Sequence, residues 1–404
     1  MKLYRAFLLL PFVSLFACSS DSENSNSENF PSFQITEDII QSPEQVLGEV
    51  EFIPLKIPEG TPIQFFGFDP NMAISDDRIF LNTDPYMNPS IHEFDLQGKH
   101  IQSIARKGGG PNEYESIDKL GLTEEGRLAA ISRTSLLEFD EKLDIQNRIN
   151  LRQVGSYFVI DFHPFEEKKW LVALRGTDPE EDGYFKNFAV FDRDSLTYEF
   201  LPLKSYPASG SGEAGSIVPY EEGFLLNFGA SDTIFYYSKG TIQPLLSMNS
   251  GDRSMPEESR LQPEDKADEE LERMIATQTY DFYFGNVEVA GETINTQVFG
   301  ITPKPLSPSE LEEMEEIPAD FPVYEVFMHP GTKQIKASKV VPGLGGMPFS
   351  DGEYFYRLLY TETWNQLLET GQLGEKHTQA LQIASEQLVD QEDPIVIRYK
   401  VRWD

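Results

Sequence analysis

The sequence is poor in cysteine, with Cys18 as the single example in 404 residues. A chain with no second thiol forms no internal disulfide and has no cysteine-rich zinc site, so its stability depends on a large apolar core. No stretch of the chain resembles a Gly-x-Ser-x-Gly elbow, which leaves no sign of a serine hydrolase of that type.

Basic residues are also scarce, since 33 Lys and Arg stand against 67 Asp and Glu, for a formal net charge of −34. Such a surface repels phosphate, so we expect no nucleic-acid partner and no electrostatic docking on anionic membranes. The excess of acid fits a cation site or, more simply, a role in keeping the chain soluble.

The N-terminus has the pattern of a lipoprotein signal. Lys2 and Arg5 precede an apolar run from Ala6 to Phe16 that is too short to span a bilayer, and Ala17 precedes Cys18. We expect residues 1–17 to be a signal peptide, Cys18 to be lipidated, and polar residues 18–32 to be a flexible tether. The expected location is the outer membrane, with either leaflet and the cell surface left open.

Repeated strand patterns predict an all-β fold over residues 33–404. Short apolar runs after Asp or Gly turns, such as Arg78–Leu81 and Arg127–Ile131, are each followed by a second run, such as Ile91–Asp95 and Leu136–Asp140. The spacing of the second run is typical of a propeller blade. We expect six blades, at 67–106, 117–150, 157–203, 215–247, 280–341 and 347–403; a two-sheet sandwich is the alternative fold.

Strand 49–55 has no local partner, and strand 395–401 would otherwise be a bare edge, so we expect the two to pair and close the ring. Helical spacing predicts insertions near 256–278, 307–316 and 362–389. These insertions either cover the central channel or pack on the rim.

The segment from Ile104 to Tyr114 reads Ile-Ala-Arg-Lys-Gly-Gly-Gly-Pro-Asn-Glu-Tyr. It resembles the glycine-rich loop of the six-bladed β-propeller lipoproteins of Bacteroidota, relatives of the NHL-type propellers, with Asn112 in place of the usual second glycine. The lipobox, Phe52–Leu55 and the strand after Asp393-Pro394 extend the resemblance. It implies an exported, membrane-tethered scaffold that binds a ligand or partner, and it supplies no catalytic residue.

Physically, Gly108–Gly110 and Pro111 suit a tight crossover that Glu113 and Tyr114 anchor to the next blade. A phosphate-binding loop beside Arg106 and Lys107 is less favoured, because a strand rather than a helix follows.

We expect a binding scaffold for a glycan, a peptide or an envelope protein. The candidates for ligand contacts are Arg106, Tyr114, Tyr184 and Trp364. Other aromatic candidates, for stacking or for blade packing, are Tyr86, Tyr157 and Tyr220.

The first alternative is an enzyme at the channel, either a metal-dependent lyase like some NHL-type relatives or a hydrolase; the second is a structural subunit of an outer-membrane complex. The five histidines, at 92, 100, 163, 329 and 377, show no zinc spacing, although His163 and His329 could meet at the axis. The acidic run Asp178–Asp182 lacks the pattern of a calcium loop. We therefore predict no cofactor, with calcium or zinc unsupported, and leave the ligand and oligomeric state open.

Overall fold

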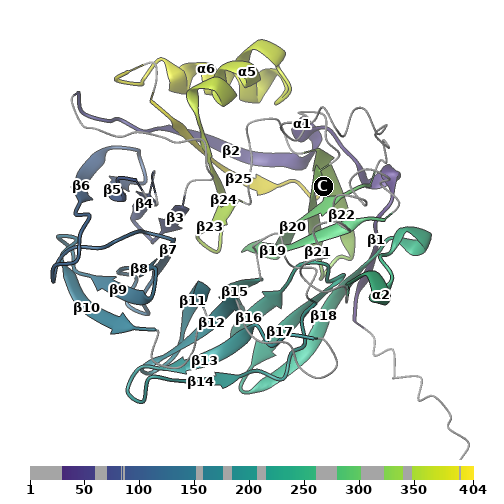
Figure 1. Ribbon diagram of the computed structural model, residues 1–404. Helices are drawn as coiled ribbons and strands as arrows, with labels where there is room; N and C mark the ends of the chain where they lie inside the picture. The colour runs from purple at the N-terminus through teal and green to yellow at the C-terminus, as the bar shows by residue number, and fades with distance from the viewer. Residues whose placement is uncertain are drawn as a thin grey trace, which may run out of the picture. The chain divides into compact units, whose positions relative to one another are not determined.

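The computed structural model is built from six antiparallel sheets that follow one another along the chain (Figure 1). It describes residues 30–59, 71–82, 84, 87–151, 158–175, 184–206, 215–260, 280–301, 323–339, 348–390 and 393–404. Each sheet is one blade, and its strands run in chain order from the inside to the outside, except that two N-terminal strands form the outer edges of the fourth and sixth blades.

The strand bounds of the first three blades are β3 (Asn71–Ile74), β4 (Arg78–Asn82), β5 (Ser90–Asp95) and β6 (His100–Ala105); β7 (Lys119–Leu122), β8 (Leu128–Ser132), β9 (Ser135–Phe139) and β10 (Ile145–Asn150); and β11 (Phe158–Glu166), β12 (Lys169–Arg175), β13 (Phe188–Asp192) and β14 (Thr197–Phe200). Those of the last three are β15 (Ser216–Tyr220), β16 (Gly223–Asn227), β17 (Thr233–Ser238) and β18 (Thr241–Asn249); β19 (Phe282–Ala290), β20 (Thr293–Phe299), β21 (Val323–His329) and β22 (Gln334–Lys339); and β23 (Phe349–Ser350), β24 (Phe355–Leu359) and β25 (Ile395–Val401).

The innermost strands form a closed circle. Strand β3 contacts β7, β7 contacts β11, and the series continues through β15, β19 and β23 back to β3. A circle of six inner strands is a six-bladed β-propeller and not a two-sheet sandwich. The fold class expected from the repeats is therefore confirmed. The neighbouring blades cover both faces of the second strand of a blade. For this reason Trp170–Leu174 in β12 is apolar and buried throughout.

The ring is closed by the pairing expected from the sequence. Strand β2 (Leu47–Pro54) is antiparallel to β25, with Phe52 opposite Ile397 and Ile53 opposite Val396. The N-terminal strand thereby becomes the outer strand of the sixth blade, and β25 is no longer an edge.

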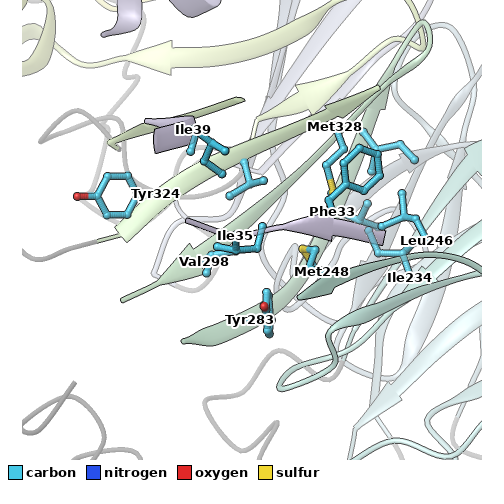
Figure 2. Close-up of a cluster of buried hydrophobic side chains, with 14 of the residues drawn as sticks. Phe33, Ile35, Ile39, Ile234, Leu246, Met248, Tyr283, Val298, Tyr324 and Met328 are labelled. Atoms are coloured by element: carbon cyan, nitrogen blue, oxygen red, sulfur yellow. The ribbon is translucent and has the colours of Figure 1, made fainter. Parts of the chain in front are cut away.

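The sequence did not predict the strand that comes before β2. Strand β1 (Ser32–Gln34) pairs in parallel with β18, as a fifth strand of the fourth blade. The chain then passes through η1 (Glu37–Ile39), a bridge from Ile40 to Ala337 of the fifth blade, and α1 (Pro43–Val46). Figure 2 shows Phe33, Ile35 and Ile39 within the core between the fourth and fifth blades. This N-terminal segment is thus part of the fold across three blades.

The helical insertion predicted at 362–389 is a pair of helices, α5 (Thr361–Thr370) and α6 (Glu375–Ser385), separated by Gly371 at φ +62°. Their apolar faces join the core of the sixth blade, and α6 contacts the outer strand β2 (Figure 1). This insertion therefore packs on the rim.

Of the insertion expected at 256–278, the structure describes the short helix α2 (Glu257–Arg260). A 3-10 turn, η4 (Gly251–Arg253), comes just before it. The remainder, and the helix expected at 307–316, lie outside the described residues. In the described part of the chain, no helix has the length and apolar character needed to cross a membrane.

Candidate functional site

Polar side chains of the innermost strands join the blades around the centre. Asn71 of β3 donates through Nδ2 to the Asp118 carbonyl (2.8 Å) and accepts at Oδ1 from the Leu120 N–H (2.9 Å). Asp161 of β11 accepts at Oδ2 from the Ile217 N–H of β15 (2.9 Å). Each bond satisfies a backbone group at a blade boundary, where no strand ladder reaches it.

Side-chain hydrogen bonds to the backbone of the next inner strand also occur on the other side of the ring. Ser216 of β15 donates to the Gly285 carbonyl (3.3 Å) and accepts from the Val287 N–H (2.9 Å). Ser350 of β23 donates to the Val289 carbonyl. Polar side chains thus link adjacent inner strands at four places in the ring, through Asn71, Asp161, Ser216 and Ser350.

Four ionisable residues form what we call the central cluster: Lys119, Asp161, His163 and Glu288. They come from β7, β11 and β19, the inner strands of the second, third and fifth blades. Lys119 Nζ lies 3.4 Å from Asp161 Oδ1, and the two side chains are 34% and 7% exposed. Glu288 interacts electrostatically with both partners of this ion pair. The cluster thus gathers charges from blades that are far apart in the sequence.

The environment keeps part of the cluster uncharged. Burial raises the pKa of Glu288 to about 8; Lys119 opposes this shift and Asp161 adds to it. Burial also lowers the pKa of His163, against the attraction of Asp161. At neutral pH Glu288 is therefore mainly a carboxylic acid that can donate a hydrogen bond, and His163 is a neutral imidazole.

The strand that carries Asp161 and His163 also carries an exposed aromatic side chain. Phe158, the first residue of β11 and three residues before Asp161, is 50% exposed. An exposed aromatic side chain near hydrogen-bonding groups is suited to stacking on a sugar ring or a peptide side chain.

The glycine-rich loop proves to be a structural crossover. The Gly110 N–H donates to Glu113 Oε2 (2.8 Å), and the Gly108 N–H donates to the Tyr114 carbonyl (3.0 Å). Arg106 Nη1 binds Asp144 Oδ1 (2.7 Å) of the second blade. The loop is therefore closed on itself by Glu113, and strand β7 follows it.

Asn112, where the resembling family has glycine, has its own role. Its Nδ2 donates to Asp144 Oδ1 (2.6 Å), and its Oδ1 accepts from the Ile145 N–H (2.7 Å). The side chain ties the crossover to the turn between β9 and β10.

Two of the predicted ligand contacts have almost no exposed surface. Tyr114 is 0% exposed and donates to the Ile104 carbonyl (3.2 Å). Trp364 of α5 is 3% exposed and donates to the Asp393 carbonyl (3.3 Å). Both side chains are packed in the interior, which is what the blade-packing alternative predicts for aromatic residues. Neither has an exposed surface that a ligand could contact in this structure.

The other two keep partly exposed side chains, and ligand binding by them stays a prediction. Arg106 is 31% exposed beside Asp144. Tyr184 donates to Glu257 Oε1, and its ring lies 5.5 Å from the ring of Tyr206 and 5.2 Å from Lys204 Nζ. Tyr220 is half-buried against Tyr236. Tyr86 and Tyr157 lie outside the described residues.

The histidines are placed in different parts of the ring. His163 is on an innermost strand, whereas His329 ends β21, the third strand of its blade, with Nε2 3.2 Å from Glu292. These two histidines therefore do not meet at the axis, which was the less favoured alternative to ordinary turn histidines. His92 and His100 share Ser103 in the first blade, and His377 is buried in α6.

Among the residues with described positions, no three His, Cys, Asp or Glu side chains come together as a potential metal site. The acidic run 178–182 falls outside those positions.

Sequence reasoning missed Lys119, Asp161, Glu288 and Phe158. A signal was present, because Asp161 and Glu288 are charged residues inside apolar strand patterns, Val159–Phe162 and Val287–Val289. Charged residues are rarely buried without a partner or a function. Only the ring closure shows that these positions share one centre.

Comparisons with known proteins agree with this fold. Residues 34–297 match a family described as a domain of unknown function (DUF4934). A presumed exported protein from Bacteroides fragilis has a similar structure, with 14% identity, a TM-score of 0.64, and coverage of 92% of this chain and 99% of that one.

Two further structures are more distant. Virginiamycin B lyase from Staphylococcus aureus has a TM-score of 0.38 at 11% identity, covering 87% of this chain and 99% of its own. The Pan2 WD40 domain from Neurospora crassa has a TM-score of 0.40 at 9% identity, covering 79% and 83%. No functionally curated protein is detectably similar in sequence.

Proposed function

We propose that this chain, which belongs to the DUF4934 family of unknown function, is an exported, lipid-anchored β-propeller that binds a glycan or a peptide at its central channel. The observation that carries the proposal is the central cluster, which offers donors and acceptors from three blades; the exposed ring of Phe158 is on the same strand as Asp161. Ligands of propellers and other scaffolds bind in concave sites with a few convergent polar groups.

The expected anchor is Cys18, after a signal peptide over residues 1–17. The structural similarity to a presumed exported protein supports export. The test is to express the full chain and its Cys18→Ser variant in a bacterium with labelled palmitate. We expect the label and membrane association in the parent chain only. Equal label in both chains would contradict the anchor without bearing on ligand binding.

Ligand binding is tested with the chain that begins at Ser19, screened on glycan and peptide arrays. For the best ligand we expect Glu288→Gln and Lys119→Met to weaken binding by about tenfold or more, since each removes a hydrogen bond to a charged or polar group. The matched control is Lys168→Met, because the Lys168–Asp194 pair is on the surface, with side chains 58% and 68% exposed. Equal effects of all three variants would contradict a site at the cluster.

A second function is favoured by one observation, the raised pKa of Glu288 beside the carboxylate of Asp161. Two carboxyl groups with separated pKa values are the usual acid and base, or acid and nucleophile, of a hydrolase of glycosides. If a glycan retained on the array is cleaved over hours by the parent chain and not by Glu288→Gln, the protein is a hydrolase rather than a scaffold.

A further inference from the structure

An exposed aromatic ring and an exposed guanidinium are neighbours at one end of the third blade. Phe158, the first residue of β11, is the cross-strand partner of Arg175, the last residue of β12. Cross-strand partners point to the same face of a sheet, with their Cβ atoms about 5 Å apart. Phe158 is 50% exposed, and Arg175 is exposed as well. Both side chains are therefore accessible to one ligand.

A β-bulge places this pair on the same face of the blade as Asp161 of the central cluster. The register of β11 against β12 skips Ile160, which has no partner in β12. Without this bulge, Phe158 and Asp161 are three residues apart and would point to opposite faces. With it, they share a face and lie opposite Arg175 and Ala173, which are two residues apart. Two residues of a strand span about 7 Å, so the Phe158–Arg175 pair borders the cluster.

The charges of the cluster and of this pair sum to one positive charge. The carboxylate of Asp161 is balanced by Lys119, its ion-pair partner. Glu288, with its raised pKa, is mainly uncharged at neutral pH, and the lowered pKa of His163 keeps that imidazole neutral. Arg175 has no hydrogen bond and no ion pair with any residue that the structure describes. Its permanent charge is thus left over, in a chain whose net charge is −34.

A guanidinium of this kind favours a carboxylate in the ligand. Its planar fork donates two parallel hydrogen bonds to the two oxygen atoms of a carboxylate, and such charge-assisted bonds are stronger than neutral ones. A carboxylate also carries one negative charge, which matches the single charge of Arg175. A phosphate group carries a charge of about −1.5 to −2 at neutral pH and would bring an excess of negative charge.

The ring of Phe158 indicates what carries this carboxylate. An exposed aromatic ring stacks on the flat C–H face of a sugar ring. In a uronic acid the carboxylate is attached directly to the sugar ring, so a sugar stacked on Phe158 has its carboxylate at the neighbouring position of the sheet, where Arg175 lies. An acidic peptide holds its carboxylates on flexible methylene groups, and ordering these groups costs conformational entropy. A uronic acid therefore fits the pair better than a peptide does.

We propose that the ligand of the central channel is an acidic glycan, of which one uronic acid stacks on Phe158 and binds Arg175 through its carboxylate. This inference rests on the proposed function and names the class of ligand for the same site. The next sugar along the glycan offers its hydroxyl groups to the hydrogen-bonding groups of the central cluster.

The test uses the chain from Ser19 and calorimetric titration with trisaccharides of galacturonate, glucuronate, mannuronate and guluronate, each beside its neutral methyl ester. For the trisaccharide that binds best, we expect the acid to bind about tenfold or more tightly than the ester, because the ester loses the charge-assisted bonds. Arg175→Gln should abolish this preference. Phe158→Ala should weaken the binding of acid and ester alike, by about threefold to tenfold, and keep the preference. Both side chains are exposed, so both variants should unfold at the same urea concentration as the parent.

The matched control is Arg127→Gln, in the turn between β7 and β8, where the arginine side chain is 42% exposed beside Glu125. It should leave the preference for the acid unchanged. Equal affinities for acid and ester, a preference that survives Arg175→Gln, or binding confined to acidic peptides would each overturn the inference. In these cases the proposed function still holds if Glu288→Gln weakens the binding that is observed. If no glycan and no peptide binds, the proposed function fails and this inference fails with it.

Discussion

Lys119 of the second blade and Asp161 of the third form an ion pair with 3.4 Å between Nζ and Oδ1, and it joins two innermost strands of the ring. Asp161 is nearly buried, and its other oxygen binds the fourth blade through the Ile217 N–H. A single carboxylate thus connects three blades. Its partner Lys119 carries the positive charge that opposes protonation of Glu288.

Removal of the Lys119 charge is expected to affect both Asp161 and Glu288. Lys119→Met should destabilise the fold by about 2 kcal/mol, because it leaves Asp161 buried without its counter-charge, while partial exposure of Lys119 limits the loss. It should also raise the pKa of Glu288 further. Urea unfolding and carboxyl NMR titration measure the two effects. An unchanged Glu288 titration in the variant would show that the two groups are not coupled.

Glu288 is expected to make stability fall as pH rises. Its pKa is raised from 4.5 to about 8, so between these values the folded protein keeps a proton that the unfolded chain releases. The free energy of unfolding should therefore decline between about pH 5 and about pH 9, on the order of a few kcal/mol in total. Urea unfolding of the parent and of Glu288→Gln measures the difference, which isolates this group from other acids. Parallel pH profiles in the two proteins would refute the shift.

Neighbouring glycines of the crossover loop are expected to differ. A Cβ atom on Gly108 would lie 2.1 Å from Glu113 Oε2, whereas one on Gly109 meets nothing within 4 Å. Gly108→Ala should displace Glu113 from the Gly110 N–H and cost about 1 kcal/mol, and Gly109→Ala should be neutral. In a Glu113→Ala background the Gly108 substitution should cost nothing more. Equal costs for the two alanines, measured by urea unfolding, would contradict this interpretation.

Restoring the glycine of the resembling family is expected to weaken this protein. Asn112→Gly removes the bonds to Asp144 and to the Ile145 N–H and should cost about 1–2 kcal/mol. Thermal and urea unfolding measure the change. A variant as stable as the parent would mean that the crossover does not depend on this side chain.

The unexpected strand β1 is expected to contribute to stability. Phe33 is 3% exposed in the core between the fourth and fifth blades, so Phe33→Ala should cost about 3 kcal/mol. Gln34, the exposed neighbour on the same strand, provides the control, and Gln34→Ala should be nearly neutral. If both variants unfold at the same urea concentration as the parent, β1 does not contribute to the fold.

The blades were predictable because their signals are local. Runs such as Ile91–Asp95 and Leu136–Asp140 carry their own strand and turn pattern, and the pairing of β2 with β25 followed from one strand without a partner and one bare edge. Strand β1 was missed because three residues, Ser-Phe-Gln, carry no periodicity, and its partner lies more than two hundred residues away. Trp364 was treated as a surface candidate, although its helical face is the one that the sixth blade buries.

The amino-acid sequence by itself determined the repeat, the number of blades and the strands that close the ring, because hydrophobic alternation and turn residues act over a few positions. The tertiary structure decided which polar residues meet. Lys119, Asp161 and Glu288 become one cluster because ring closure brings three inner strands to a common centre. The low-dielectric environment created there gives Glu288 its shifted pKa, and no property of an isolated segment contains that information.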